Sequence, residues 1–329
     1  MAEKVEFDER IYDVLLKTFE TELNAGLKDY YVWKFNSKIL DNPIINPKLK
    51  TEILSIEDVD GNIPKRTFIL KNSLQENMKK LNADDKKLLD YAYWIIQDWG
   101  GIRKYKRNRK NDDRIKDVKK CVDCGRYDIS FDVISSLSKV ASFLRGNDYA
   151  VYDSRVIFIL NWLIFINGLH EQENPKGKMK FFQQPDTQNS NIKEHCQNTI
   201  FCLAYRKFDS VDTLYYTEEE SYEVYCELLK STCEYYKKNK TKYTEIDEKE
   251  SDVPKVTIGA IEMCLFSIAA KNKKLSKNKI TCNYDDREGN NEKDCYITNQ
   301  MDRILRDPIV KALKEERKRL LSKWMVPNK

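Results

Sequence analysis

Apolar residues recur at helical spacing through most of this chain. Asp84–Trp99 repeats them three and four positions apart, at Leu88, Ala92, Ile95, Ile96 and Trp99. Gly100 and Gly101 follow, as residues that end a helix often do. Asp132–Leu144 carries one continuous apolar face, and Glu218–Tyr236 and Ile309–Trp324 show the same spacing. The pattern predicts a helix in each of these segments.

Strand signals are few. Arg66–Lys71, with the sequence RTFILK, is the best strand candidate, although a buried turn of helix would give the same short pattern. Ten glycines and eight prolines in 329 residues favour long helices over a turn-rich β architecture. We therefore expect a mainly α protein with at most a minor strand element.

Three polar stretches interrupt the helical pattern and predict loops or linkers: Asn174–Ile192, Lys237–Pro254 and Lys271–Lys293. We find no internal repeat. The expected organisation is a mainly helical N-terminal region, residues 1–80, followed by a helical core with C-terminal helices, residues 81–329.

Charge and cysteine content indicate the compartment. The chain has 58 basic and 53 acidic residues, a formal net charge of +5, which decides little by itself. Nine cysteines without a secretion signal predict reduced thiols in a cytoplasm. The longest apolar run, Val156–Ile166, is too short to span a bilayer. We expect a cytoplasmic protein without a membrane anchor.

Candidate chemistry lies between Ile134 and Leu160. Lys139 belongs to the predicted helix, and Asp153 stands fourteen residues later, at the head of an almost wholly apolar segment. That segment needs an N-cap, for which Asp is favoured, so Asp153 could simply cap a buried helix. Alternatively, a fixed carboxylate close to a lysine can stabilise a developing cation, while the amine acts as a nucleophile.

The flanking residues favour the second interpretation. Lys139-Val140-Ala141 and Val151-Tyr152-Asp153-Ser154-Arg155-Val156 resemble the lysine helix and the aspartate motif of the helix-hairpin-helix DNA glycosylase superfamily, in particular its bacterial 8-oxoguanine-glycosylase-like branch. The resemblance implies a helix-hairpin-helix fold and excision of a damaged or modified base from double-stranded DNA, with no cofactor. It makes Asp153 the stabiliser of the sugar cation and Lys139 the candidate amine.

The same resemblance implies further contacts. Tyr152 adjoins Asp153 and is a candidate for the base pocket, and Arg155 is a candidate for a DNA phosphate or for holding Asp153 in place. The hairpin of the superfamily is glycine-rich, whereas Ile134–Lys139 contains no glycine. We expect the Ser138 hydroxyl to replace part of that phosphate contact. Alternatively, Lys139 is an ordinary surface lysine, which lies on a solvated helix face together with Ser135, Ser142 and Arg145.

A dense basic segment precedes the predicted lysine helix. Its candidates for DNA-backbone binding are Arg103, Lys104, Lys106, Arg107, Arg109 and Lys110. Such a run can neutralise several phosphates, although an ordinary solvated surface has the same composition.

Other chemistries have less support. Cys121 and Cys124 form a CxxC pair, half of a zinc site, but no second pair follows at suitable spacing, so we expect no metal. There is no phosphate-binding loop, dinucleotide fingerprint or serine-hydrolase elbow, and only two histidines.

The sequence leaves three hypotheses in order. The first is a DNA glycosylase, acting in repair or on modified phage DNA. The second is a catalytically silent DNA-binding module of the same fold. The third is an interaction protein whose basic stretches meet an acidic partner.

Overall fold

The computed structural model describes residues 7–24, 37–55, 63–170, 179–185, 215–243, 246 and 256–271. These residues are mainly helical, as the apolar spacing predicts, and they contain no strand beyond one isolated bridge between Phe181 and Tyr215. The predicted helix Ile309–Trp324 and most of the three predicted loops lie outside the described residues.

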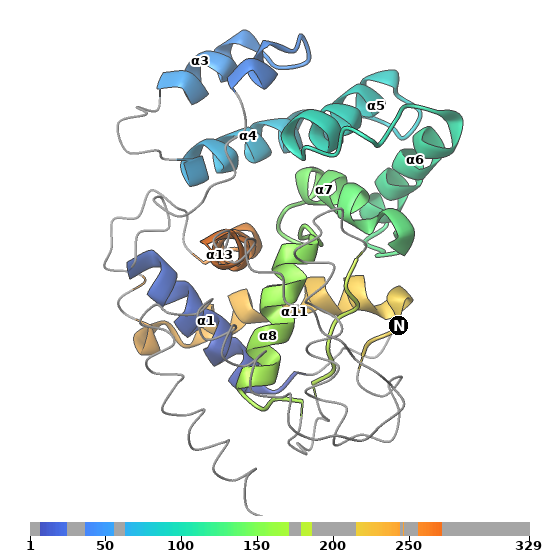
Figure 1. The fold of residues 1–329 in the computed structure, drawn as a ribbon. Helices are drawn as coiled ribbons and strands as arrows, with labels where there is room; N and C mark the ends of the chain where they lie inside the picture. The colour runs from blue at the N-terminus through green and yellow to red at the C-terminus, as the bar shows by residue number, and fades with distance from the viewer. Residues whose placement is uncertain are drawn as a thin grey trace, which may run out of the picture.

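The helices form two groups that meet near the middle of the molecule (Figure 1). One group contains η1 (Ser37–Asp41), α3 (Pro47–Ser55), α4 (Ile63–Met78), α5 (Lys86–Tyr93), η3 (Trp94–Trp99), α6 (Arg109–Asp123), η4 (Phe131–Val133) and α7 (Ile134–Leu144). The other contains α1 (Glu9–Asn24), α8 (Ser154–Ile166), α11 (Glu218–Lys238), η5 (Lys240–Lys242) and α13 (Ile258–Lys271).

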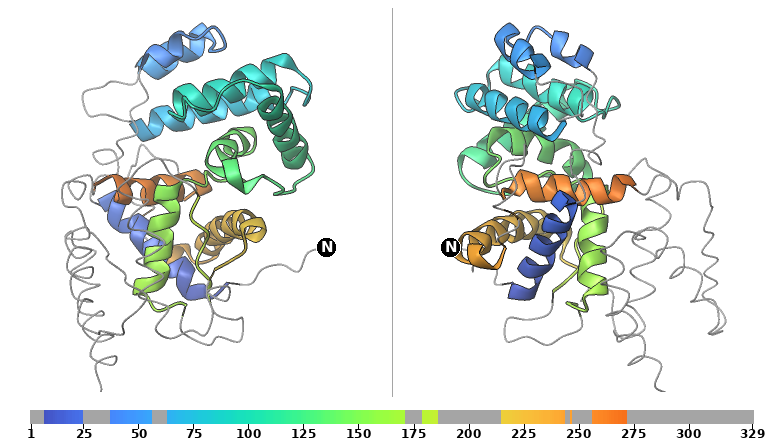
Figure 2. Two further views of the ribbon diagram at one scale, coloured as in Figure 1. Left: turned by 45° about the vertical axis from the view of Figure 1, so that its right-hand side comes forward. Right: turned by 90° about the vertical axis from the view of Figure 1, so that its left-hand side faces the viewer.

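The expected boundary near residue 80 does not separate these groups. α1 packs against α11 and α13, whereas α4 packs against α7 (Figure 2). Residues from the first 80 positions therefore contribute to both groups, and the described part of this region is not a unit of its own.

Local sequence explains where several helices begin. Asp85 caps α5 by accepting a hydrogen bond from the Lys87 amide, and Asn108 caps α6 through the Asn111 amide. At the start of α11, Thr217 and Glu220 form a reciprocal capping box.

The predicted strand Arg66–Lys71 is wrong, because these residues lie within α4. Thr67, Leu70 and Lys71 are the buried ones, and their spacing is that of one helix face. Six residues are too few for this spacing to be told from a buried strand by pattern alone.

The predicted helix Asp84–Trp99 changes character in its second half. Trp94–Trp99 is a π-helix, in which the Gly100 amide donates to the Ile95 carbonyl at 2.7 Å. Gly101 then takes a φ of +70°, which ends the segment in the left-handed region that favours glycine. This turn brings the chain beside α7.

α7 and α8 meet across a short connection at the junction of the two groups. All but one residue of α7 is buried, and α8 packs along α13. The candidate lysine and aspartate belong to these two helices.

Candidate functional site around Lys139 and Asp153

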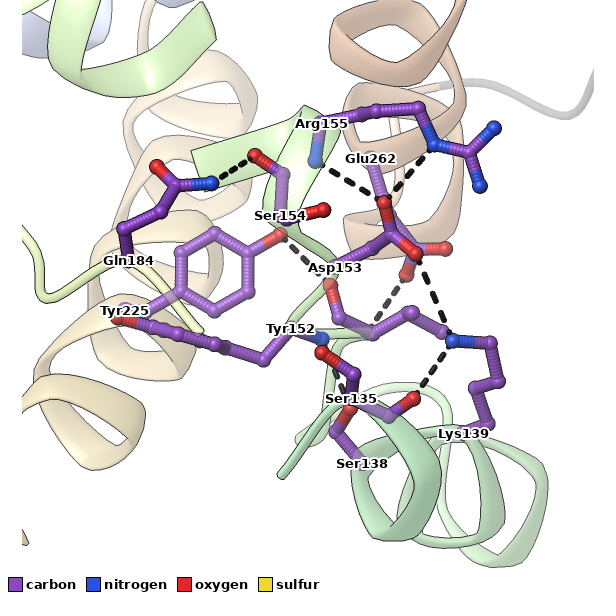
Figure 3. Close-up of polar contacts among 11 residues, drawn as sticks. Ser135, Ser138, Lys139, Tyr152, Asp153, Ser154, Arg155, Gln184, Tyr225 and Glu262 are labelled. Atoms are coloured by element: carbon purple, nitrogen blue, oxygen red, sulfur yellow. Dashed lines mark hydrogen bonds and ion pairs between the residues drawn. The ribbon is translucent and has the colours of Figure 1, made fainter. Parts of the chain in front are cut away.

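Lys139 of α7 and Asp153 at the start of α8 form a buried ion pair. Their Nζ and Oδ2 atoms are 3.6 Å apart, and both side chains point into the junction between the helices (Figure 3). Lys139 is 4% exposed, and the Asp153 side chain is 13% exposed. The structure thus brings together the two residues that the sequence singled out.

Asp153 is both a helix cap and an ion-pair partner. Its Oδ1 accepts hydrogen bonds from the backbone amide of Arg155 at 3.0 Å and from the Arg155 Nε at 3.1 Å. Because Oδ1 is used in this way, Oδ2 is directed towards Lys139. One oxygen of Asp153 therefore caps α8 and the other faces Lys139, so that capping and a chemical role are compatible.

Lys139 does not lie on a solvated face, so that alternative is wrong. Its Nζ donates a hydrogen bond to the Ser135 carbonyl oxygen at 2.6 Å, and Ser142 on the same helix is buried too. The aliphatic stem lies against Gly100, where a Cβ would come within 2.8 Å of the Lys139 Cδ.

Burial and neighbouring charges shift the pKa of both groups. Burial lowers the pKa of Lys139, and the attraction of Asp153 and Glu262 only partly opposes this effect. For Asp153, burial acts to raise the pKa, but the charges of Arg155 and Lys139 and the hydrogen bonds from Arg155 outweigh it and bring the pKa to about 2. The carboxylate stays ionised at neutral pH beside an amine that loses its proton more easily than a surface lysine.

Ser138 and Tyr152 have structural roles, which corrects their assignment to DNA. Both are fully buried, and the Ser138 Oγ accepts a hydrogen bond from the Tyr152 backbone amide at 2.9 Å. The Tyr152 hydroxyl donates to the Gln183 carbonyl oxygen at 2.7 Å, and its ring packs edge-on against Tyr222 and Tyr225. In this conformation neither side chain can contact a phosphate or a base, and together they fix α7 to the Asp153 segment.

The basic segment is exposed as expected. Among the described residues, no ion pair engages these five of its side chains: Arg103, Lys104, Lys106, Arg109 and Lys110. Arg107 differs, since it pairs with Asp90 at 2.7 Å and lies over the Tyr93 ring. The segment begins three residues after Gly100, which lies against the stem of Lys139.

Two buried residues, Glu262 and Lys71, and the partly buried Phe266 complete the cluster and were not assigned from the sequence. Glu262 and Phe266 come from α13 and Lys71 comes from α4. Glu262 accepts a hydrogen bond from the Val151 amide at 2.9 Å, and Arg155 lies over the Phe266 ring at 4.1 Å. A lone carboxyl group in the apolar run IGAIEMCLF was the signal that the sequence offered.

The described residues offer no metal site beside this cluster. Across the described ranges, no three His, Cys, Asp or Glu side chains converge as a metal site requires. Cys121 is buried and donates to the Asp128 carbonyl oxygen, whereas Cys124 is exposed. The sequence contains further residues of types that bind metals, and His195, Cys196, Cys202, Cys282 and Cys295 lie outside the described residues.

None of the helices that the structure describes combines the length and apolar character needed to cross a bilayer. No protein-family model matches the chain, and neither a curated protein sequence nor a solved structure is significantly similar to it.

Proposed function

We propose that the protein is a DNA glycosylase, which flips a damaged or modified base out of duplex DNA and cleaves its N-glycosidic bond. The observation that carries the proposal is the buried pair of Lys139 and Asp153, in which an ionised carboxylate lies beside an amine of lowered pKa. Few structural roles need a lysine so deeply buried, because desolvating its charge costs stability.

Each group has a role in this reaction. Breaking the N-glycosidic bond builds positive charge on the sugar, and the Asp153 carboxylate stabilises that charge. Once Lys139 leaves its hydrogen bond to Ser135, its unprotonated amine can attack C1′ of the sugar as the base departs, and opening of the C1′–O4′ bond then gives a Schiff base. β-Elimination of the 3′ phosphate from this Schiff base cleaves the strand. Solvent reaches the cluster mainly at Arg155, whose side chain is 26% exposed, so the flipped nucleotide would enter from that side.

The surrounding helices support this role. α6 and α7 pack together as a helix–loop–helix unit, with Lys139 on the second helix, an arrangement that fits the resemblance to the helix-hairpin-helix glycosylases. The exposed basic segment 103–110 lies at the start of this unit and would hold the DNA backbone. The substrate is either a damaged base, as in repair, or a modified base, as in phage DNA.

The test is base release from duplexes that carry oxidised, deaminated, alkylated or hypermodified bases. Strand cleavage after alkali that Asp153→Asn abolishes would support a glycosylase, and cleavage without alkali that Lys139→Met abolishes would add the lyase step. Asp148→Asn is the matched control, since Asp148 lies in the same connection but pairs with Arg145 and Lys230. If the wild-type protein releases no base from any duplex, or if Asp153→Asn releases it as fast, the proposal fails.

The second candidate is a catalytically silent DNA-binding module of the same fold. It is favoured by the burial of Ser138 and Tyr152, which leaves two expected DNA contacts in the core. This candidate predicts salt-dependent duplex binding without base release, and an Asp153→Asn variant that changes stability alone.

A further inference from the structure

Glu262 is a buried carboxyl group for which the proposed reaction gives no role. It lies on α13, is 7% exposed, and points towards Asp153 and Lys139 (Figure 3). Its Oε2 accepts a hydrogen bond from the backbone amide of Val151, two residues before Asp153. A buried carboxyl in an otherwise apolar helix costs stability unless such partners compensate it.

Phe266 contacts the other side of the same segment. It follows Glu262 by about one helical turn, so both side chains lie on one face of α13. The guanidinium carbon of Arg155, two residues after Asp153, is 4.1 Å from the centroid of the Phe266 ring. α13 therefore holds the chain both before and after Asp153.

Glu262 also acts on Lys139 through its charge. Among the described residues, the charged groups that face the Lys139 amine are Asp153 and Arg155 from the start of α8 and Glu262 from α13. Lys71 of α4 faces Glu262 in turn. Burial raises the pKa of Glu262, while Lys71, the Val151 amide and Lys139 oppose that rise. Glu262 and Lys139 thus influence the ionisation of each other.

We propose that Glu262 and Phe266 are positioning residues, which hold the Asp153 segment from both sides and place a second carboxyl group beside the Lys139 amine. This inference rests on the proposed function, because it names the residues that control the two reacting groups. Glu262 touches neither substrate nor the reacting atoms, and acts through Val151 and Lys139.

The experiment follows the Lys139 amine by NMR in the full chain labelled with carbon-13 at the lysine ε position, with the signal assigned by Lys139→Met. Glu262→Gln keeps an acceptor for the Val151 amide but removes the charge. We expect the pKa of Lys139 to fall in Glu262→Gln, because Glu262 acts to raise it. Glu227→Gln is the control, since Glu227 is a half-buried glutamate on α11 that contacts Tyr127 and Lys230.

Activity provides the second measurement. Displacement of the reacting groups by about 1 Å can cost roughly 100-fold in rate, so Phe266→Leu should lower base release by tenfold or more with little change in KM. Glu262→Gln should move the pH dependence of the Lys139 step towards lower pH. An unchanged Lys139 titration in Glu262→Gln, in a variant that melts as the wild type does, would overturn the inference.

The two proposals fail in different ways. If the wild-type protein releases no base but the Lys139 titration moves in Glu262→Gln and not in Glu227→Gln, the role of Glu262 stands without the glycosylase reaction. If base release depends on Asp153, but Glu262→Gln changes neither the Lys139 titration nor the pH dependence of the activity, the reaction stands and the positioning role is wrong.

Discussion

Gly100 lies so close to Lys139 that a methyl group at this glycine would come within 2.8 Å of the Lys139 Cδ. The same methyl group would lie 2.8 Å from the carbonyl oxygens of Ile95 and Ile96. The end of the π-helix and the stem of the lysine therefore fit together only if residue 100 has no side chain.

We expect Gly100→Ala to destabilise the protein by about 1–3 kcal/mol, as overpacking of a tight contact does. Urea unfolding measures the change. Gly125→Ala is the control, because a Cβ there meets nothing within 4 Å and only the positive φ of 68° opposes it. Its cost should be near the roughly 1–2 kcal/mol of a left-handed residue, without effect on Lys139. A Gly100→Ala variant with the same free energy of unfolding as the wild type would contradict the contact.

Removal of the Lys139 charge should cost little stability. In the part of the chain that the structure describes, three basic side chains, Lys71, Lys139 and Arg155, face the two carboxyl groups of Asp153 and Glu262. Lys139→Met leaves two against two, and Asp153 keeps Arg155 and its backbone partner. We expect the free energy of unfolding to stay within about 1 kcal/mol of the wild type or to rise, while any lyase activity disappears.

Asp153→Asn should destabilise the protein more, although asparagine is also a good N-cap. The substitution leaves Glu262 as the remaining carboxylate of the described cluster, opposite Lys71, Lys139 and Arg155. We expect a loss of roughly 1–3 kcal/mol, below the roughly 3–5 kcal/mol of a fully buried pair, because Arg155 is partly exposed. A Lys139→Met variant less stable than Asp153→Asn would contradict this account of the charges.

The Asp153 carboxylate should also make the free energy of unfolding depend on pH in the acid range. The folded pKa of Asp153, about 2, lies below its ordinary value of 3.8. A depressed carboxyl pKa contributes stability that is present above about pH 4 and is lost as the pH falls towards 2, here roughly 2 kcal/mol. Unfolding measured between about pH 5 and pH 2 should therefore be less pH-dependent in Asp153→Asn than in the wild type. If the free energy of unfolding falls equally with pH in Asp153→Asn and in the wild type, another group is responsible for the acid sensitivity.

The basic segment predicts a salt effect on DNA binding. Lys104→Glu and Lys106→Glu should each weaken duplex binding for all sequences, and should lower the slope of log K against log salt by about 0.9 for each phosphate that the segment no longer neutralises. Lys79→Glu is the control, since Lys79 is a half-exposed lysine paired with Glu76 on α4. If the control variant loses as much affinity, general charge rather than this segment attracts the DNA.

The pairing of Lys139 with Asp153 was predictable because both lie within one helix–loop–helix stretch of the sequence. Glu262 was not, since it reaches the pair from far along the chain and only packing of α13 on α8 brings it there. Ser138 and Tyr152 were assigned to DNA on motif position, but the Tyr152 amide needs a buried acceptor, which the Ser138 hydroxyl supplies. Motif position indicated which residues lie near the pair of Lys139 and Asp153, whereas the hydrogen bonds show which of them are held in the core.

The π-helix Trp94–Trp99 also has a consequence for how this chain can vary in length. A π-turn holds one residue more than an α-turn, and a single deletion within it would restore the α-helical register. Because a π-turn takes up its extra residue locally, the residues on both sides of the deletion would keep their faces of the helix. A chain one residue shorter within this turn would therefore still place Gly100 beside the stem of Lys139. The turn is the position at which this helix can lose a residue without displacing the buried amine.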